Sequence, residues 1–335
     1  MNATAVPSIC PICQQAALAP SGQTVDLDKV LARWEEQPQV RFPDAVRQKY
    51  GSGAFPEVTL WRCGACGFGR FEPAAAGDAG FYAAIAATDY YVADRWEFTQ
   101  AARDLRRAGV GRVLDIGCGS GHFLRFLRQH EPAMDLSGHD LNEALLTALA
   151  AEGFGTLSGP LDELAARAGR IEPFDALCLF QVLEHAEDPQ HFLARALALL
   201  RPGGIVVITT PNAAGPIRKF PEALTEVPPH HVTQWTEAAF RAGLPRFGLR
   251  VEAVRFEPLP DYLWESYLPV QWADGIWPAT LFGPLAARQG LTEPHAAADF
   301  AARQLRAAGI RHLHGVPGHT IYVQARREED EHGSL

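Results

Sequence analysis

The sequence lacks a long apolar run, a basic amino terminus and an excess of positive charge. No stretch approaches the roughly 18 consecutive apolar residues that span a bilayer, and residues 1–20 lack the basic start and apolar core of a signal peptide. We therefore expect a soluble, cytoplasmic protein without a membrane span. Its 30 Lys and Arg against 39 Asp and Glu give a formal charge of -9. Because proteins that bind phosphate backbones usually carry a basic stripe, we expect no nucleic-acid partner.

Cysteine is scarce, and its spacing is informative. Four of the six cysteines form two Cys-x-x-Cys pairs, Cys10 with Cys13 and Cys63 with Cys66. In a reducing compartment such pairs indicate a metal before a disulfide. Four thiolates suit tetrahedral Zn²⁺ and leave no open position for water, so we predict a structural zinc site. The alternative is free thiols or a redox pair. We hypothesise that the zinc site pins the amino-terminal segment against the rest of the chain and helps to form one wall of a substrate cleft.

The composition changes along the chain predict three parts. Residues 1–72 hold both cysteine pairs and are expected to form a zinc-binding module. Residues 73–257 and 319–330 are expected to form an α/β domain. Residues 258–318 are rich in Pro, Trp and Ala and are expected to form a helical insertion, a substrate lid or an interface. Five aromatic residues of this insertion could line a pocket, dock a sugar ring, form a homodimer interface or make a small core of their own: Trp264, Tyr267, Trp272, Trp277 and Phe282.

Short apolar runs alternate with helical patterns in the second part. The runs are 112–116, 134–140, 154–157, 174–180 and 204–210. This alternation is typical of βαβ units around a parallel sheet. Residues 250–256 and 319–325 are predicted to pair, which makes the last strand antiparallel. A helix over 189–200 is predicted to end in a turn at Arg201-Pro202-Gly203-Gly204. The predicted fold is a Rossmann-like three-layer α/β domain with a mainly parallel seven-stranded sheet.

A glycine-rich loop follows the first predicted strand and opens a helix. It comprises Asp115-Ile116-Gly117-Cys118-Gly119-Ser120-Gly121. Its glycines let the backbone turn sharply and approach a ligand closely, and the helix behind it presents free N–H groups. Asp140 ends the second predicted strand, where an acid can accept hydrogen bonds from both ribose hydroxyls of a nucleoside cofactor. The alternative is that Asp140 caps the helix beginning at Leu141-Asn142.

These segments together resemble a known enzyme family. The stretch from Val113 to Gly121, with its leading acid, resembles the first motif of class I S-adenosylmethionine-dependent methyltransferases. The segments 174–185, 200–204 and 210–212 are similar to later motifs of the same family. The resemblance covers residues 80–257 and the last strand. It implies the Rossmann-like fold, S-adenosylmethionine as cofactor and methyl transfer as the reaction.

The resemblance also assigns the cofactor contacts. It places the three glycines close to the methionine moiety, with Asp115 beneath that moiety and Gln181 under the methionine side. It places the ribose on Asp140 and the adenine on Leu141, with Asp162 in the adenine region. It implies that Tyr91 closes over the cofactor carboxylate, unless this aromatic patch only packs on the core. The residues concerned are Asp115, Gly117, Gly119, Gly121, Asp140, Leu141, Asp162, Gln181 and Tyr91.

Transfer of a methyl group to a hydroxyl needs somewhere for a proton to go, and histidine titrates near neutrality. Glu184-His185 resembles the Glu-His of ubiquinone-biosynthesis and related small-molecule O-methyltransferases. Gln181 replaces an earlier acid of that pattern, which puts a catalytic metal there in doubt. The alternative for His185 is to cap its loop and pack under the cofactor.

A second histidine pair lies in Pro228-Pro229-His230-His231, after the fifth predicted strand and at the edge where open α/β sheets bind ligands. The run His-His followed by Trp-Thr is similar to that of methyltransferases acting on small molecules and glycans. We expect His231 or His230 to be the base or a substrate contact, and Thr236 to cap the following helix.

The expected reaction is methyl transfer to a small-molecule acceptor. The leading acceptor is a hydroxyl of a sugar, a glycan precursor or a secondary metabolite. The sequence lacks the Asn/Asp-Pro-Pro-aromatic run of many nucleic-acid amino-methyltransferases after the fourth strand, which favours oxygen or carbon as the acceptor atom. Three alternatives stay open: a sugar C-methyltransferase acting beside a carbonyl, an RNA methyltransferase docked by the zinc module, and a non-catalytic cofactor-binding protein.

Overall fold

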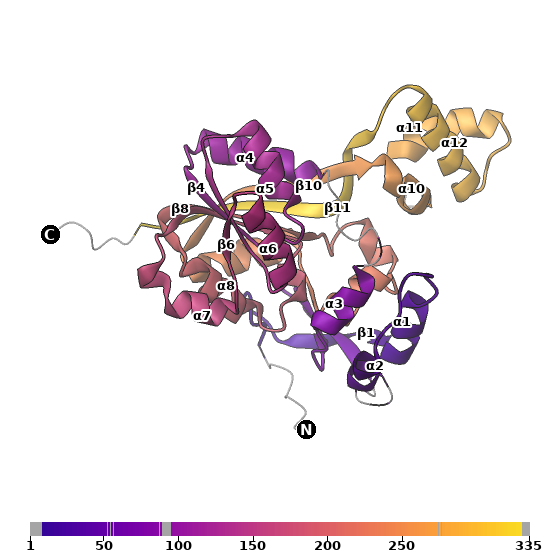
Figure 1. Cartoon of the computed structure of the whole chain (residues 1–335). Coiled ribbons are helices and arrows are strands. Elements are labelled where there is room, and N and C mark those ends of the chain that lie inside the picture. The colour runs from indigo at the N-terminus through magenta and orange to yellow at the C-terminus, as the bar shows by residue number, and fades with distance from the viewer. Residues whose placement is uncertain are drawn as a thin grey trace.

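The computed structural model describes residues 9–51, 53, 55, 57–86, 88, 95–273, 275 and 277–329. Within them the chain forms a central α/β domain, an amino-terminal module on one side of it and a group of helices at the end of two long strands (Figure 1). None of the helices in these ranges is long and apolar enough to cross a membrane.

The central domain is built on a seven-stranded sheet in the order β10-β11-β8-β7-β4-β5-β6. The five strands from β8 to β6 are parallel, whereas β11 runs antiparallel between β8 and β10. This confirms the predicted Rossmann-like fold and the pairing of residues 250–256 with the last strand. The strands are β4 (Arg112–Ile116), β5 (Asp135–His139), β6 (Gly155–Leu157), β7 (Phe174–Phe180), β8 (Leu200–Pro211), β10 (Leu249–Pro260) and β11 (His312–Arg327).

Helices cover both faces of this sheet because its central strands are apolar on both sides. Val113 and Cys178 face a core shared with α4, α5 and α6, whereas Leu114 and Leu177 face a core shared with α7, α8 and α9. Alternate residues of a strand point to opposite faces, so the continuous apolar runs require two helical layers. The helices are α4 (Trp96–Arg107), α5 (His122–His130), α6 (Glu143–Ala151), α7 (Leu161–Ala166), α8 (Pro189–Leu197) and α9 (Glu237–Gly243).

The predicted turn at 201–204 is wrong. Helix α8 ends at Leu197, and β8 already begins at Leu200, which pairs with Phe174. The next pair is Ala176 with Ile205, so the extra residues on β8 form a bulge. Gly203, with φ of 72°, supplies the left-handed backbone of this irregularity. The Pro-Gly-Gly signal thus marked a break in strand pairing rather than a connection.

The amino-terminal module contains a second, four-stranded antiparallel sheet in the order β1-β2-β3-β9. Three strands come from the first 72 residues, but β9 lies directly after His230-His231. Val30, Trp34 and Phe71 of the module pack with Phe81 and Val227 in one core. The elements are β1 (Leu18–Val25), β2 (Val58–Cys63), β3 (Gly69–Glu72), β9 (Thr233–Gln234), α1 (Leu27–Trp34), α2 (Asp44–Tyr50) and α3 (Ala79–Ile85).

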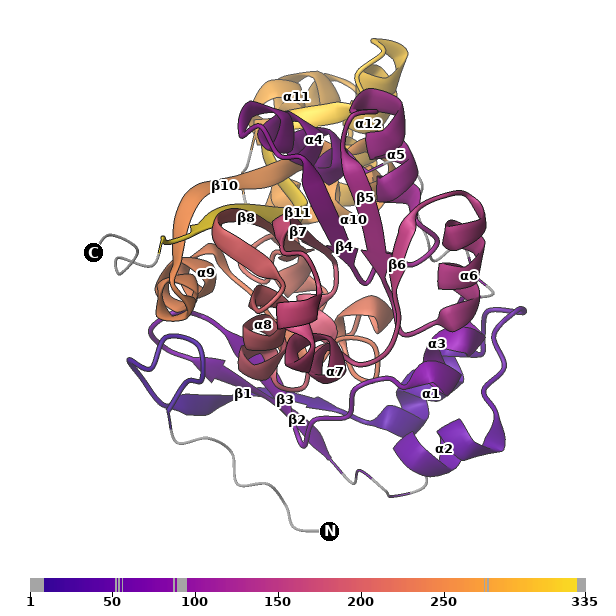
Figure 2. The same cartoon turned by 60° about the vertical axis from the view of Figure 1, so that its left-hand side comes forward.

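Helix α3 lies in the range predicted to belong to the α/β domain, yet its Phe81 and Ile85 join the core of the module. Figure 2 shows α1, α2, α3 and the second sheet together below the central domain. Within the described residues, α3 and β9 therefore connect the amino-terminal module to the central domain.

The insertion is helical between residues 261 and 311, because β10 continues to Pro260 and β11 begins at His312. Its helices are α10 (Trp264–Ala273), α11 (Trp277–Arg288) and α12 (Pro294–Ala307). Trp264, Tyr267 and Leu268 pack with Ala302 and Leu305 in a separate small core. Phe282 packs against the same core, so three of the five predicted aromatic residues have a packing role.

Candidate functional site

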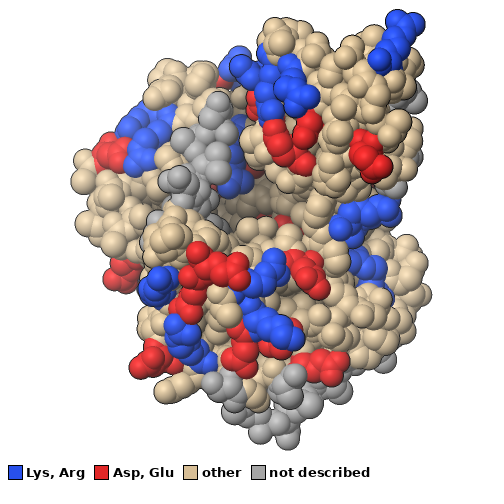
Figure 3. All heavy atoms as spheres, turned by 90° about the vertical axis from the view of Figure 1, so that its right-hand side faces the viewer, with Lys and Arg blue, Asp and Glu red and all other residues tan. Residues whose placement is uncertain are grey.

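A cleft of about 1500 Å³ lies at the carboxyl ends of β4, β5 and β7. Its floor comes from the central sheet, and its walls come from α3 of the amino-terminal module and from the ends of β10 and β11 that carry the insertion. Figure 3 shows the surface hollowed between the insertion helices above and the module below. A ligand in this cleft would touch all three parts of the chain.

The glycine loop enters the cleft in the conformation that its sequence requires. Gly117, Gly119 and Gly121 have φ angles of 73°, 51° and 79°. A Cβ on Gly117 would lie 2.5 Å from Val182, and a Cβ on Gly121 would lie 2.2 Å from Leu149. Gly117 and Gly119 line the cleft, whereas Gly121 lies behind them at the start of α5 and does not line it.

Asp140 is tied to this loop. Its Oδ2 accepts a hydrogen bond of 2.8 Å from the Gly119 N–H, and its Oδ1 accepts one of 2.9 Å from the Asn142 N–H. The cap of α6 is Asn142, whose side chain accepts from the Ala144 N–H. The alternative that Asp140 caps this helix is therefore wrong. The Asp140 carboxylate lines the cleft next to the glycines.

Asp115 lies beneath the loop and is 3% exposed. Burial, reinforced by the nearby charge of Asp140, raises its pKa well above the usual value. Gln181 directly follows β7 and also lines the cleft. Its backbone has φ of 55°, and its N–H donates to the Thr209 carbonyl over 3.0 Å.

Two of the other predicted cofactor residues, Leu141 and Asp162, also line the cleft. Leu141 is 74% exposed, which is unusual for a leucine and leaves an apolar surface beside Asp140. Asp162 is on α7 and pairs with His191 and Arg195 of α8, each at 2.8 Å. These partners lower its pKa. Tyr91 lies outside the described residues.

The structure brings the two predicted histidine sites together in the same cleft. One ring nitrogen each of His185, His230 and His231 lies within 4.8 Å of the others, so this group could also accept a metal ion. His185 Nδ1 lies 2.7 Å from the His230 carbonyl and 2.8 Å from the Tyr82 hydroxyl. His230 Nδ1 lies 2.9 Å from the Thr225 carbonyl. A carbonyl only accepts, so these contacts put a proton on Nδ1 of both rings.

His231 lies between two buried carboxyl groups. Its Nε2 is 3.9 Å from Glu184 Oε1, and its Nδ1 is 3.7 Å from Glu226 Oε2. Both carboxyl oxygens of Glu184 are buried and have no hydrogen-bond partner among the described residues. Glu184 does not line the large cleft, whereas His231 and Glu226 do.

Burial sets the charge of this cluster. It lowers the pKa of His185 to about 4 and the pKa values of His230 and His231 well below the usual range. It raises the pKa of Glu184 well above the usual value and that of Glu226 to about 7. The histidines are therefore neutral near pH 7 and have lone pairs that can accept a proton.

Sequence reasoning missed Glu226 and His319. His319 Nε2 lies 3.4 Å from Glu226 Oε1, and both residues line the cleft. His319 lies in the middle of β11, far along the chain from the other three histidines. Only the fold brings it there, so no local pattern could have identified it. Glu226 directly precedes Val227-Pro228-Pro229, where the prolines were the one local signal.

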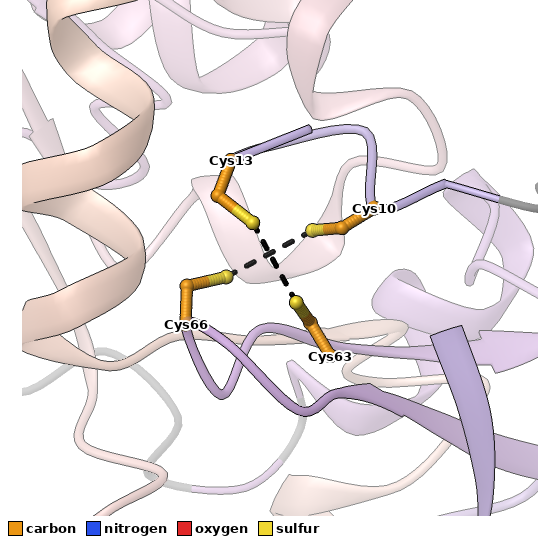
Figure 4. A group of neighbouring side chains, drawn as sticks. All are labelled: Cys10, Cys13, Cys63 and Cys66. Atoms are coloured by element: carbon orange, nitrogen blue, oxygen red, sulfur yellow. Dashed lines mark hydrogen bonds between the residues drawn. The ribbon is translucent and has the colours of Figure 1, made fainter. Parts of the chain in front are cut away.

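The four predicted metal-ligating cysteines converge in the amino-terminal module. Cys10 Sγ lies 3.8 Å from Cys66 Sγ, and Cys13 Sγ lies 3.5 Å from Cys63 Sγ. All four thiols point toward one centre (Figure 4) and are buried. This donor set and spacing fit a tetrahedral metal ion. Cys118 and Cys178 are buried elsewhere, as expected.

The cysteine group is connected to the histidine loop through backbone pairing. Thr236 caps α9, as predicted, and its hydroxyl also donates to the Cys66 carbonyl over 2.6 Å. Gly69 and Arg70 of β3 pair with β9. The Phe71 N–H donates to the Val232 carbonyl, one residue after His231. The strand that leaves the cysteines therefore fixes the chain just beyond the histidines.

Comparison with known proteins agrees with this geometry. Residues 90–254 match a family described as a methyltransferase domain. The chain is 31% identical over 174 residues to a ubiquinone biosynthesis O-methyltransferase of Parvibaculum lavamentivorans, a match that covers 48% of this chain and 68% of the relative. It is 30% identical over 142 residues to a probable S-adenosylmethionine-dependent methyltransferase of Mycolicibacterium smegmatis, covering 42% of this chain and 52% of the relative.

For two further ubiquinone biosynthesis O-methyltransferases, of Caulobacter sp. and Bordetella avium, the chain spans 56% and 43% of the relative's length. Among solved structures, a putative sarcosine dimethylglycine methyltransferase from Galdieria sulphuraria matches with a TM-score of 0.44 and 15% identity. That match covers 70% of this chain and 86% of the other.

Proposed function

Because the chain belongs to the S-adenosylmethionine-dependent methyltransferases, we propose that it methylates a hydroxyl group of a small polar molecule held in the cleft. The named relatives act as O-methyltransferases in ubiquinone biosynthesis, which supports oxygen as the acceptor atom here. A sugar, a glycan precursor or a secondary metabolite fits the polar lining of the acceptor end, which includes His231, Glu226, His319 and Thr320.

The residues at the glycine-loop end fit the cofactor. Asp140 would accept hydrogen bonds from the ribose hydroxyls while the Gly119 and Asn142 N–H groups hold its carboxylate in place. The exposed Leu141 side chain would pack on the adenine, and Asp162 would lie at its edge. The methionine part would extend past Gly117 and Gly119 toward Gln181. The methyl group would then point to the histidine cluster.

The observation that carries the proposal is the neutral histidine cluster at the acceptor end. When the cofactor is bound, its sulfonium supplies the methyl group. This chain holds the acceptor oxygen in line and receives the proton that leaves it. Among the three rings, we assign His231 as the base, because its Nδ1 lies 3.7 Å from Glu226 Oε2, a carboxyl group that lines the same cleft. His185 and His230 each donate a hydrogen bond from Nδ1 to a backbone carbonyl, and these bonds fix their rings beside His231.

The cysteine group would hold a structural Zn²⁺ that fixes the wall of the acceptor end. The chain beyond His231 pairs with β3, the strand that follows these cysteines. A bound Zn²⁺ that holds the cysteines in place would therefore also hold His231 in place. The division of the chain at residues 72, 257 and 318 remains part of this proposal: a zinc-binding module, a methyltransferase domain and a helical insertion.

Calorimetric titration with S-adenosylmethionine, with metal content read on the same sample, tests the proposal. We expect micromolar binding and about one zinc per chain, followed by methyl transfer to a hydroxyl compound in an acceptor screen. Titration with NADH is the control for a different nucleotide cofactor. Failure to bind S-adenosylmethionine would contradict the assigned cofactor site. Binding without transfer to any acceptor would instead support a non-catalytic cofactor-binding protein.

A further inference from the structure

A row of mostly buried polar side chains extends from His231, the proposed base, to Tyr267 in the insertion, with carboxyl groups and imidazoles alternating along most of it. The distances along it are 3.9 Å from Glu184 to His231, 3.7 Å from His231 to Glu226 and 3.4 Å from Glu226 to His319. His319 Nδ1 then lies 3.0 Å from the hydroxyl of Tyr267 on α10. Glu226, His231 and Tyr267 are all at most 6% exposed. Buried polar groups are normally retained only where they have partners, so this line requires an explanation.

We propose that Glu226 is a proton-relay residue that takes the proton from His231, and that His319 and Tyr267 are positioning residues that hold Glu226 ready for it. This inference rests on the proposed function, because it concerns the proton released by the acceptor hydroxyl. It adds two residues that no sequence motif marks, and it connects the insertion to the chemistry.

The steps balance as follows. The acceptor oxygen forms a bond to the methyl carbon, and the carbon–sulfur bond breaks with its electron pair left on sulfur. The acceptor O–H bond breaks, and its proton goes to Nε2 of the neutral His231. The proton on Nδ1 of His231 then passes to the Glu226 carboxylate, which leaves His231 neutral again. No oxidant, reductant or further reactant is needed.

The environment of Glu226 suits this role better than that of Glu184. The groups that face Glu226 are His231 and Thr225 from its own loop, Glu184 from the segment after β7, His319 from β11 and Tyr267 from α10. Burial raises the pKa of Glu226 to about 7, and the charge of His319 opposes this rise. A carboxyl with this pKa can both take up and release a proton near neutral pH. Glu184 does not line the cleft, and burial raises its pKa well above the usual value although the charge of Arg95 opposes this rise.

The distances of 3.4–3.9 Å exceed the upper limit of about 3.2 Å for an N–H···O hydrogen bond by about 0.2 to 0.7 Å. Catalytic contacts are often long before the substrate binds, and a rotation of the Glu226 carboxyl group or one bridging water would close them. Tyr267 is anchored in the small core of the insertion together with Trp264. The insertion therefore supplies a rigid end to the line.

Histidine-selective ¹⁵N NMR of the full chain, followed from pH 5.5 to 8.5, tests the relay without an acceptor. We expect the ring signals of His231 and His319 to shift together with a midpoint near pH 7. The shift should vanish in Glu226→Gln and persist in Glu226→Asp. Glu222→Gln is the matched control, because Glu222 is exposed in the same loop and does not line the cleft. The signals are assigned from His231→Gln and His319→Gln, or from ring-to-backbone correlations if a variant does not fold.

Kinetics with an acceptor identified in the screen gives the second readout. In wild type we expect kcat to rise with pH through about 7, because Glu226 must lose its proton before it can accept another. Glu226→Gln should lower kcat by about 100-fold or more and remove this limb, with unchanged S-adenosylmethionine affinity. Glu226→Asp should restore the limb. His319→Gln should move it to higher pH, since the opposing positive charge is lost.

Three results would overturn the relay. The first is that His231 and His319 show no common midpoint between pH 6 and 8 in wild type, or show the same midpoint in Glu226→Gln. The second is a Glu226→Gln enzyme with wild-type kcat and pH profile. The third is loss of turnover on chelation while the cysteine-bound metal stays in place, because His231 would then be a metal ligand. Absence of transfer by wild type would contradict the proposed function instead, and the NMR titration would still decide on the relay.

Discussion

At the scale of single residues, Asp140 is the clearest test of the cofactor site. Its carboxylate is oriented by two backbone N–H donors and faces the cleft. We expect Asp140→Ala to weaken S-adenosylmethionine binding by about 10- to 100-fold, because hydrogen bonds to a charged group contribute about 1.5–3 kcal/mol. Isothermal titration calorimetry measures the change. Asp135→Ala, an exposed acid at the start of the same β5, is the control; equal losses in both variants would contradict the ribose assignment.

Gly121 tests the conformation of the loop rather than its contacts. It has φ of 79°, and an added Cβ would lie 2.2 Å from Leu149 Cδ2. We expect Gly121→Ala to lower the free energy of unfolding by about 1–3 kcal/mol, since both backbone strain and overpacking are introduced. Urea unfolding followed by circular dichroism measures it. Gly169→Ala, which has open space around its Cβ and no positive φ, should change the free energy of unfolding by less than about 0.5 kcal/mol.

Residue types in local patterns were predictable, but partners from distant parts of the chain were not. The glycine loop, Asp140 and the four cysteines could be proposed as site residues because each lies in a short motif whose chemistry is tied to its spacing. Glu226 and His319 belong to no such motif, and they meet only because β11 returns antiparallel beside β8. That His230 and His185 face each other also depends on where the loop after β8 folds back.

At the scale of elements, the testable unit is the pair of Cys-x-x-Cys turns that carry the four thiols, which we call the cysteine hairpin. The turns at residues 10–13 and 63–66 each supply two thiols, and all four are buried. We expect Cys63→Ser to lose the bound zinc, about one equivalent per chain, and to unfold at a lower temperature, because the module core alone replaces little of the metal's binding energy. Atomic emission on the desalted protein measures the zinc. Cys178→Ala, a buried cysteine of β7 outside the group, should keep the full equivalent. Full zinc content in Cys63→Ser would contradict the assignment of the four cysteines as the zinc ligands.

Strands were predicted better than their ends. The run 174–180 coincides with β7, because apolar residues fill it from end to end. The start of β8 was missed, since Pro202, Gly203 and Gly204 usually end an element but here form a bulge within one. β10 and β11 extend beyond the predicted pair as a two-stranded ribbon. Polar and apolar residues do not alternate regularly along this ribbon, so the sequence pattern could not predict where its strands begin and end.

At the scale of the whole molecule, the end of the cleft proposed to bind the cofactor and the end proposed to bind the acceptor depend on different parts of the chain. The glycine loop and Asp140 rest on the central sheet, whereas the histidine loop is fixed by β3 and β9 of the amino-terminal module. The acceptor end also receives Tyr262 and His319, on either side of the insertion. Damage to the module or the insertion should therefore affect the acceptor more than the cofactor.

Tyr262 tests this separation from the side of the insertion. Its ring lines the cleft yet is 70% exposed, so it packs little within the protein itself. We expect Tyr262→Ala to raise the acceptor KM by about 2- to 10-fold, since a lost aromatic contact contributes about 0.5–1.5 kcal/mol, while the Kd for S-adenosylmethionine changes by less than twofold. Steady-state kinetics at saturating cofactor and calorimetry measure the two. Ile310→Ala, exposed two residues before β11 and outside the cleft, is the matched control. An equal rise in both constants would contradict the separation.

Removal of the zinc tests the same separation from the side of the module. The backbone bond from Phe71 to Val232 and the bond from Thr236 to Cys66 both join the cysteine hairpin to the chain around His231. Chelation should loosen this hairpin first. We therefore expect kcat to fall by at least about 10-fold, because a displaced base no longer reaches the acceptor oxygen, while S-adenosylmethionine affinity stays within about threefold. Re-addition of one equivalent of Zn²⁺ should restore kcat. If cofactor affinity and kcat fall together, the metal instead supports the whole fold and does not selectively order the acceptor end.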